Sequence, residues 1–238
     1  MQRYVDAVNE LQKDRVYSRR DIINQLKNRQ NLSDNSCSWI FGSLVRDGSV
    51  VRLGRDRYSI TPSSPRSTYV PGYSDMAQSL SGVIDGEYPH VKFAVFETSL
   101  LNEFLNHLIA QNTIFIQVEK ESSIFIFRFL QNLGYANVMY KPDRRDFELY
   151  WSKNCIVITN LVSEAPLGGV QHSVTLEKML VDMVSDKLIS TTYSASELGS
   201  VIQEAGEKYT LDKVRLLRYA RRRGREDEMK RYLAMSNC

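Results

Sequence analysis

The sequence predicts an α/β protein of two domains, and three observations support this prediction. Residues 1–62 show three helical patterns followed by two short strand-like runs around a glycine turn. Residues 63–74 form a proline-containing stretch without helical or strand periodicity, which is typical of a linker. Residues 75–238 alternate strand and helix patterns and then become helical to the end, which indicates a mixed sheet, helices packed on it and a C-terminal helical tail.

The expected first domain, residues 1–62, begins with three helices. Apolar residues recur at helical spacing across residues 4–11. Ser18 and Asp21 have the spacing of a capping box, in which each side chain accepts a hydrogen bond from the other residue's amide, and a second helix follows. A third helix is expected between Ser33 and Gly48, because glycine readily adopts the left-handed conformation that ends a helix.

A hairpin is expected after the third helix. Residues 49–60 contain two β-type runs on either side of a turn with Gly54. Three helices and a basic hairpin within about 60 residues follow the order of a winged helix-turn-helix, whose third helix enters the major groove of DNA. The sequence therefore predicts double-stranded DNA as a partner.

The third expected helix has an apolar side and an outward side at about 100° per residue. Its apolar side holds Cys37, Ile40, Phe41 and Leu44. The candidate DNA-reading residues on this helix are Asn35, Ser38, Trp39, Ser43 and Arg46. An exposed tryptophan is unusual, so Trp39 is expected either to pack on sugar or thymine methyl groups or to dock on the second domain.

Positive charge gathers on the expected hairpin. Residues 1–62 carry 11 Lys and Arg against 7 Asp and Glu. Arg52, Arg55 and Arg57 are expected to contact the phosphate backbone, with Arg19 and Arg20 adding contacts from the start of the second helix. The alternative is a protein-interaction module whose winged helix does not bind DNA, since fold alone does not establish function.

The expected second domain, residues 75–238, contains a mixed sheet. The strand candidates are residues 91–96, 113–118, 136–140, 147–150 and 155–161. Helices are expected over residues 101–108 and 124–133. Four helical patterns after residue 175 form the expected tail.

A metal-dependent nuclease is the enzymatic alternative. Asp143, Asp146, Glu148 and Lys153 fall on an expected β-hairpin, and such enzymes use carboxylates to hold Mg²⁺ and a lysine to stabilise developing charge. However, Tyr150 stands where the usual D/E-x-K pattern would place the lysine. The chain also lacks a GxxxxGK[ST] phosphate loop and a GxSxG elbow, and its three histidines are dispersed. We therefore expect no enzyme activity, no cofactor and no metal site.

A second basic patch is expected near the C-terminus. It comprises Arg218, Arg221, Arg222, Arg223 and Arg225. Cations near the C-terminus of a helix interact favourably with the helix dipole, and a following glycine can end the helix. These two effects explain part of the cluster. A second contact to the DNA backbone or to an acidic partner remains the alternative interpretation.

Composition favours a cytoplasmic protein that does not enter a membrane. The three cysteines stand far apart, which suits a reducing compartment. No apolar stretch approaches the roughly 20 residues that cross a bilayer. The first ten residues contain acids where a signal peptide has an apolar core.

Two segments carry a resemblance to a known family. Residues 51–58, VRLGRDRY, are similar to the basic wing ending in tyrosine of AbiEi-like proteins, the antitoxin and repressor half of type IV toxin–antitoxin systems. Residues 174–182 resemble that family's T-P-E-[RK]-x-L-x-D helix start, with Leu176 in place of the proline. The matching residues are Thr175, Glu177, Lys178, Leu180 and Asp182. Residues 212–222 and the helix after them are similar to its closing helices.

The resemblance implies a bacterial transcriptional regulator. Such a protein would repress its own operon and oppose a nucleotidyltransferase-like toxin encoded beside it. A homodimer would suit the paired half-sites that helix-turn-helix proteins bind, although no segment of the sequence marks an interface.

Overall fold

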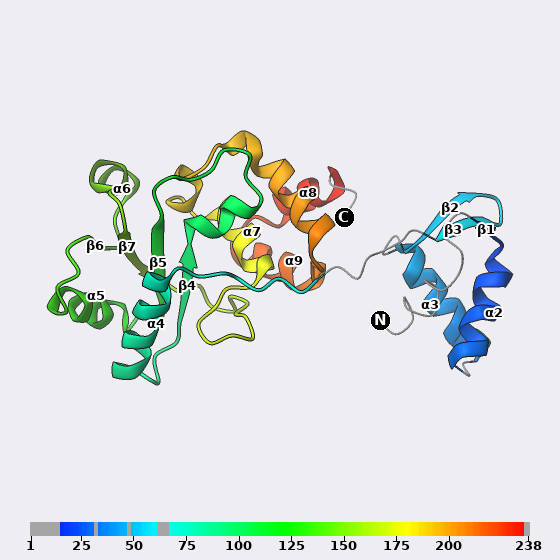
Figure 1. Cartoon of the computed structure of the whole chain (residues 1–238), viewed down its shortest axis with the longest axis horizontal. Coiled ribbons are helices and arrows are strands. Elements are labelled where there is room, and N and C mark those ends of the chain that lie inside the picture. The colour runs from blue at the N-terminus through cyan, green and yellow to red at the C-terminus, as the bar shows by residue number, and fades with distance from the viewer. Residues whose placement is uncertain (1–14, 31–32, 47–48, 61–66, 236–238) are drawn as a thin grey trace. The chain divides into compact units, whose positions relative to one another are not determined.

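A computed structural model describes residues 15–30, 33–46, 49–60 and 67–235. The chain divides into two units, Met1–Arg66 and Ser67–Cys238, and each is described by itself. The helix expected over residues 4–11 lies outside the described residues. The described residues form a mixed α/β structure with two sheets, one in each unit (Figure 1).

The described residues of the first unit form two helices and a three-stranded sheet. Its elements are β1 (Val16–Tyr17), α2 (Arg19–Gln30), α3 (Asp34–Arg46), β2 (Val50–Gly54) and β3 (Arg57–Ile60). The strand order is β1-β3-β2, and both pairings are antiparallel. The first strand therefore joins the hairpin that follows α3, which the sequence analysis did not anticipate.

Helix α2 starts at the predicted capping box. The Ser18 amide donates to Asp21 Oδ2 at 2.9 Å, and the Asp21 amide donates to Ser18 Oγ at 3.2 Å. The hydrogen bond from the Ser18 amide is the main reason that the pKa of the Asp21 carboxyl is lowered. The reciprocal caps satisfy donors that a helix start otherwise leaves unpaired, and the prediction is confirmed.

A small core holds this unit together. The predicted apolar side of α3 is confirmed, since Cys37, Ile40, Phe41 and Leu44 are all buried. They pack on Ile22 and Leu26 of α2 and on residues of the hairpin. The Phe41 and Tyr58 rings meet edge to face with centroids 5.1 Å apart, an arrangement that aromatic pairs favour.

The second unit is built on a four-stranded mixed sheet in the order β4-β5-β7-β6. The strands are β4 (Phe93–Glu97), β5 (Thr113–Val118), β6 (Val138–Tyr140) and β7 (Cys155–Asn160). β4 runs antiparallel to β5, whereas β5, β7 and β6 are parallel. The sheet confirms the expected mixed type.

Connections between the parallel strands put helices on both faces of this sheet. The chain passes from β5 through α5 (Ser123–Asn132) to β6, and returns through α6 (Arg144–Tyr150) to β7. The two crossovers run in opposite directions across the sheet, and crossovers of the same hand then lie on opposite faces. Accordingly, α5 packs with α4 (Asp75–Glu87) on one face, and Phe147 of α6 packs on the other.

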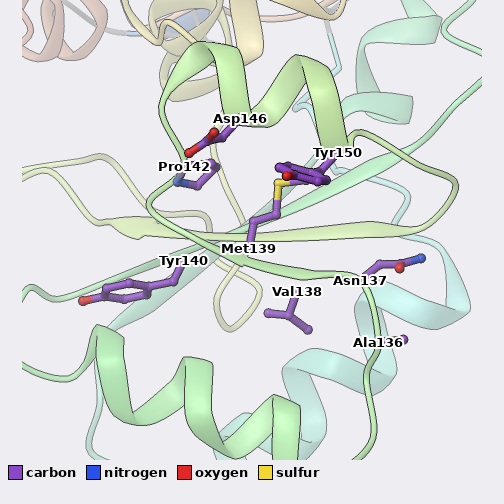
Figure 2. Close-up of a pocket in the computed structure, with 8 residues that line it drawn as sticks. All are labelled: Ala136, Asn137, Val138, Met139, Tyr140, Pro142, Asp146 and Tyr150. Atoms are coloured by element: carbon purple, nitrogen blue, oxygen red, sulfur yellow. The ribbon is translucent and has the colours of Figure 1, made fainter.

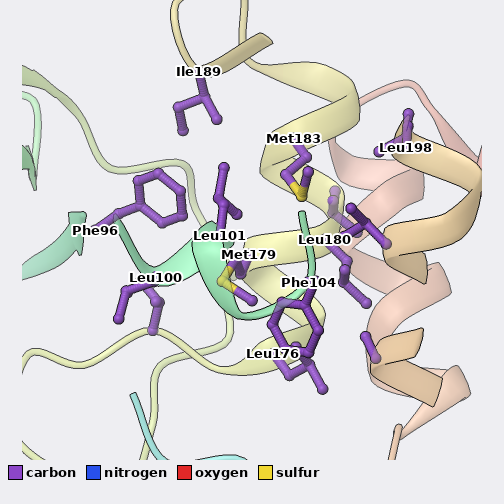
Figure 3. Packing of buried hydrophobic residues seen from close by; sticks show 14 of the residues in the cluster. Phe96, Leu100, Leu101, Phe104, Leu176, Met179, Leu180, Met183, Ile189 and Leu198 are labelled. Carbon is purple, nitrogen blue, oxygen red and sulfur yellow. The ribbon is translucent and has the colours of Figure 1, made fainter. Parts of the chain in front are cut away.

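The helical tail packs on the α6 face. It consists of α7 (Leu176–Ser185), α8 (Leu198–Lys208), α9 (Lys213–Arg222) and α10 (Glu226–Met235), with short 3₁₀ turns at Ile189–Thr191 (η2) and Ala195–Glu197 (η3). These are the four helices that the sequence predicts. Figure 3 shows Leu176, Met179 and Met183 of α7 among Phe96 and Phe104 in this core.

The outer edge of β4 is covered. The Val95 amide donates to the carbonyl of His172 at 2.8 Å, and the Tyr73 hydroxyl donates to the carbonyl of Val95 at 2.7 Å. His172 also stacks on Phe93 with ring centroids 3.6 Å apart, and its Nε2 lies 2.9 Å from Asp85 Oδ1. The segment before α7 thus closes this side of the sheet.

Part of the expected linker contacts the second unit. The Thr210 amide donates to the carbonyl of Ser67 at 3.1 Å, and Tyr69 packs against the C-terminal core. Ser74 caps α4 by accepting a hydrogen bond from the Ala77 amide at 3.2 Å. Residues 67–74 therefore lie against this unit, and residues 61–66 are outside the described residues.

Two predicted elements of this unit are wrong. Residues 147–150 form the end of α6 and not a strand, because Asp143 caps the helix by accepting from the Asp146 amide at 2.8 Å. Residues 101–108 do not form one helix, since the 3₁₀ helix η1 spans Thr98–Glu103 and Leu108 is 70% exposed.

Side-chain contacts explain the short η1 turn. Asn102 Oδ1 accepts from the Ile109 amide at 2.7 Å, and Glu197 Oε2 accepts from the Asn106 amide at 2.7 Å. Both contacts satisfy amides that a continuing helix would have paired internally, so the chain turns away instead. Within the described residues, no helix is both long enough and apolar enough to span a membrane.

Candidate nucleic-acid interface

The outward side of α3 carries most of the predicted reading residues. Asn35, Trp39 and Arg46 are exposed, and Trp39 exposes 61% of its surface. Ser38 is half-buried. Ser43 is only 9% exposed, so the prediction that it faces outward is wrong. It lies one residue before the core residue Leu44, and the buried arc of α3 is wide enough to include it.

The Arg19 side chain is exposed and also contacts α3. Its guanidinium carbon is 5.4 Å from the centroid of the Phe41 ring, and its Nη2 is 3.4 Å from Ser38 Oγ. A guanidinium held over an aromatic face is a favourable cation–π contact and has fewer accessible rotamers. The start of α2 therefore places one positive charge beside Ser38, while Arg20 is exposed.

The hairpin of β2 and β3 presents the three predicted arginines. Arg52, Arg55 and Arg57 are exposed, and Arg52 Nε donates to the carbonyl of Gly54 at 3.2 Å. Arg52 pairs with Tyr58 across the hairpin, and Tyr58 is buried against the unit's core. Tyr58 therefore anchors the hairpin to the core. Arg52 lies opposite Tyr58, and Arg55 and Arg57 lie nearer the turn.

Asp56 is a residue of the candidate interface that the sequence analysis missed. It occupies the turn between β2 and β3 with a φ of 53°, and its Oδ1 accepts from the Arg19 amide at 2.9 Å. It therefore ties the tip of the hairpin to the start of α2. The sequence offers only an aspartate in a turn, a position at which aspartate is common for local reasons.

The arginines of the second predicted patch are largely engaged within the second unit. Arg221 Nε lies 2.6 Å from Glu226 Oε2, and Arg225 Nη1 lies 3.4 Å from Glu228 Oε2. Arg222 and Arg223 donate to serine hydroxyls at 2.7 Å, those of Ser163 and Ser185 respectively. Arg218 is exposed. These contacts favour the structural interpretation, in which the cluster joins α9 to its neighbours.

The candidate nuclease residues are not gathered around one point. Asp143 is the cap of α6, and Glu148 pairs with Arg144 one turn away at 2.8 Å. Lys153 lies in the turn before β7. The prediction that these residues lie on a β-hairpin is wrong, because residues 144–150 form α6. Among the residues that the structure describes, no group of three His, Cys, Asp or Glu could hold a metal ion.

The motif at the start of α7 forms a buried polar cluster. Thr175 caps the helix by accepting from the Lys178 amide at 3.2 Å. The Lys178 ammonium pairs with Asp182 one turn on and also donates to Gln117 of β5. The Tyr219 hydroxyl of α9 donates to Asp182 Oδ1 at 2.9 Å.

This cluster joins three elements inside the second unit. The side chains of Lys178 and Asp182 are 1% and 0% exposed. Burial, and next the charge of Asp182, raise the pKa of the Tyr219 hydroxyl. Glu177 accepts from the Asp212 amide at 3.0 Å and so holds the start of α9. The motif residues Lys178 and Asp182 thus form a buried internal link between β5, α7 and α9.

The fold and surface define a two-unit α/β protein with a basic N-terminal unit. Residues 36–238 match the model of the Family of unknown function (DUF6577), and the chain belongs to this family. The match begins within α3 and extends through the second unit. A comparison with curated proteins found no match.

Proposed function

We propose that the chain is a DNA-binding transcriptional regulator whose first unit is a winged helix. The order β1, α2, α3, β2, β3 and the strand order β1-β3-β2 support this assignment. In this architecture α3 is the recognition helix and the β2–β3 hairpin is the wing. The proposal gives the chain no catalytic role.

The observation that carries the proposal is the exposed surface formed by α3 and the wing. Asn35 and Arg46 have the side chains that form bidentate hydrogen bonds to base edges, and Trp39 offers an apolar face for sugar or thymine methyl groups. The arginines of the wing, with Arg20, supply the backbone contacts. Residues 1–62 carry a net positive charge, which favours binding to the negatively charged DNA backbone.

The resemblance to AbiEi-like proteins suggests which kind of regulator the chain is. We assign the chain the role of an antitoxin in the cytoplasm that represses its own operon and opposes a nucleotidyltransferase-like toxin. The support is the wing ending at Tyr58 and the helix start at Thr175. Residues 51–58 lie in the β2–β3 hairpin, and Thr175 caps α7.

The DNA part of the proposal is tested with the full chain and two duplexes of equal length. One carries the sequence upstream of its own gene and the other a scrambled version. We expect tighter binding to the upstream duplex, and affinity for it that falls steeply with salt. Equal binding of both duplexes contradicts a sequence-specific regulator, and no binding at low salt leaves only a module for protein contacts.

The antitoxin part is tested separately by expression in cells. We expect that the product of the adjacent gene arrests growth when expressed alone and that coexpression of this chain restores growth. If the adjacent product is harmless, or if this chain gives no relief, the antitoxin role is wrong while the DNA-binding role stands.

A further inference from the structure

A hollow of about 440 Å³ lies in the second unit between three segments that are distant in sequence. These are residues 68–71, which precede α4, residues 167–177, which include the start of α7, and residues 210–215 at the start of α9. The surface of the hollow is mainly apolar and is formed in part by Tyr69, Val70, Leu167, Val170 and Leu176. This volume and this lining are typical of a site for a small molecule.

Internal contacts fix two walls of this hollow. The Gly168 amide donates to the carbonyl of Ser173 at 2.7 Å, and Ser173 Oγ donates to the carbonyl of Val170 at 2.6 Å. A Cβ on Gly168 would overlap Ser173 Oγ, so the Ser173 side chain holds this position only beside a glycine. The Tyr69 ring meets Tyr209 edge to face with centroids 5.1 Å apart. The hollow is therefore formed before a ligand binds, which lowers the cost of binding.

A buried carboxylate faces this hollow. Glu177 lines it, and the Glu177 side chain is only 6% exposed. Its Oε1 accepts from the Asp212 amide at 3.0 Å. Its Oε2 has no hydrogen-bond donor among the described residues, and Arg215 Nη1, with which it pairs, lies 3.9 Å away, beyond hydrogen-bonding distance. A buried acceptor without a donor costs free energy, so a ligand that donates to Oε2 is favoured.

The charged groups that line the hollow favour a cation over an anion. Two carboxylates, those of Glu177 and Asp212, stand against one guanidinium, that of Arg215. Of the lysines next to them in the sequence, Lys178 belongs to the buried cluster, and Lys213 is exposed and does not line the hollow. The lining therefore carries a net negative charge, and an ammonium group supplies the donor that Glu177 Oε2 lacks.

Arg215 is the group with which a ligand cation competes. Its side chain is 46% exposed, and its Nε lies 3.6 Å from Asp212 Oδ2. Arg215 therefore has a second carboxylate partner and can remain beside Asp212 while an ammonium group binds Glu177. Its positive charge weakens the binding of a cation without preventing it.

A larger hollow in the same unit lacks this arrangement. It has a volume of about 590 Å³ and lies beside β6, where Met139 extends toward Tyr150 of α6 (Figure 2). Each residue that lines it is half-buried or exposed, including Asp146. It therefore offers no buried charge for a ligand to neutralise, and the hollow at Glu177 is the better candidate for a specific site.

We propose that the hollow at Glu177 binds a small molecule with an apolar body and a primary ammonium group. The ammonium donates to Glu177 Oε2, and the body packs on Tyr69, Leu167 and Val170. An anion meets Glu177 as a like charge, and an apolar molecule without a donor leaves Oε2 unsatisfied.

The ligand class is tested by amide NMR titrations of the full chain with three probes of similar shape: phenethylamine, the neutral 2-phenylethanol and the anionic phenylacetate. We expect phenethylamine to shift the amide resonances of Gly169, Leu176 and Glu177, and to bind at least about tenfold more tightly than 2-phenylethanol. Phenylacetate should leave these resonances unchanged. No shift with phenethylamine up to about 10 mM, or equal or tighter binding of either analogue, overturns the proposal.

Two charge variants should change phenethylamine binding in opposite directions. Glu177→Gln keeps an acceptor for the Asp212 amide and removes the charge, so its dissociation constant should rise at least about tenfold. Arg215→Gln removes the competing cation, so its dissociation constant should fall about threefold. The matched control is Arg218→Gln, which should bind like the wild type, because Arg218 is exposed on the same helix and does not line the hollow.

Opposite signs distinguish recognition of charge from binding by shape alone. Glu177→Gln that binds as tightly as the wild type, or Arg215→Gln that binds more weakly, overturns the role of the Glu177 carboxylate. If Glu177→Gln does not fold, the three probes and Arg215→Gln still decide the question. These titrations use no DNA, so their outcome is independent of the proposed function.

Discussion

Asp56 is the residue at which position and charge give opposite predictions. Its carboxylate lies in the turn of the β2–β3 hairpin, between two arginines in the sequence, and accepts from the Arg19 amide. If charge alone mattered, removal of this acid would strengthen DNA binding, because one repulsion with phosphate would disappear. If the carboxylate positions the wing, its removal would weaken binding.

We expect Asp56→Ala to weaken DNA binding and to lower the free energy of unfolding by about 1 kcal/mol, because the cap on α2 is lost and alanine disfavours positive φ. Asp56→Asn keeps an oxygen acceptor and tolerates this backbone conformation, so it should bind DNA at least as tightly as the wild type. Fluorescence anisotropy with the upstream duplex and urea unfolding measure the two effects. Tighter binding by Asp56→Ala would refute the positioning role.

The buried pair of Lys178 and Asp182 makes a second prediction at this scale. Asp182 also accepts from Tyr219, with Arg223 Nε 3.8 Å away. Besides Asp182, the Lys178 ammonium donates to Gln117 and lies 5.8 Å from the centroid of the Tyr219 ring, and neither of these groups carries a negative charge. Removal of one partner from a buried pair costs about 3–5 kcal/mol. The loss of unfolding free energy in Asp182→Ala should lie near the upper end of this range, because the substitution leaves the lysine charge without a counter-ion.

Lys178→Met should cost less than Asp182→Ala. It preserves volume, and Asp182 keeps the Tyr219 hydroxyl and the nearby Arg223 guanidinium. Urea unfolding of both variants gives the comparison, with Thr175→Ala as a capping variant of the same helix that should lose about 1 kcal/mol. The reverse order of the two pair variants would show that the ammonium, and not the carboxylate, is the centre of the cluster.

At the scale of elements, the junction of α9 and α10 carries a pH dependence. Hydrogen bonds from Arg221 and then Lys230 lower the pKa of the Glu226 carboxyl from 4.5 to about 2. The folded state therefore favours the ionised carboxylate, and the resulting stabilisation is present above about pH 4.5 and lost as the pH falls toward about 2.

We expect Glu226→Gln to destabilise the chain at neutral pH and to converge with the wild type as the pH falls through this window. Chemical unfolding at several pH values measures the difference in unfolding free energy between the two proteins. The exposed Asp227 on the same helix is the matched control, since Asp227→Asn should show a smaller pH-dependent difference. A Glu226→Gln difference that stays constant with pH would refute the account of this junction.

Elements with strong caps and long apolar periodicity could be predicted from the sequence. α2 begins at the predicted capping box. α7 begins after Thr175, where both the capping threonine and the apolar periodicity after it predict a helix start. By contrast, residues 147–150 alternate in a way that fits a strand over a few residues, and only the Asp143 cap reveals a helix. η1 could not be predicted, because contacts from Glu197, distant in sequence, end it.

The candidate interface was predictable to a similar extent. Exposure of Trp39 and the wing arginines follows from helical and hairpin periodicity. Periodicity misplaced Ser43, because a small polar side chain fits at the border of a buried face. The role of Asp56 depends on a contact with residue 19, which requires the folded unit. The arginines near residue 222 could not be interpreted until their serine and carboxylate partners were in place.

At the scale of the whole molecule, the two units differ in what they expose and in what they bury. The first unit presents the exposed residues of the candidate interface, and the second contains a buried polar cluster. In the proposed function, DNA binding therefore depends on residues of the first unit, and the buried cluster stabilises the second.

The most direct test of the central claim is the salt dependence of binding to the upstream duplex for the wild type and for Arg55→Ala with Arg57→Ala. Each phosphate contact contributes about 0.9 to the slope of log affinity against log salt, so the double variant should bind more weakly with a slope reduced by about 2. The control, Arg128→Ala with Arg145→Ala, removes two exposed charges from the second unit and should match the wild type. If the wing variant retains both affinity and slope, the wing does not contact DNA and the proposed function is wrong.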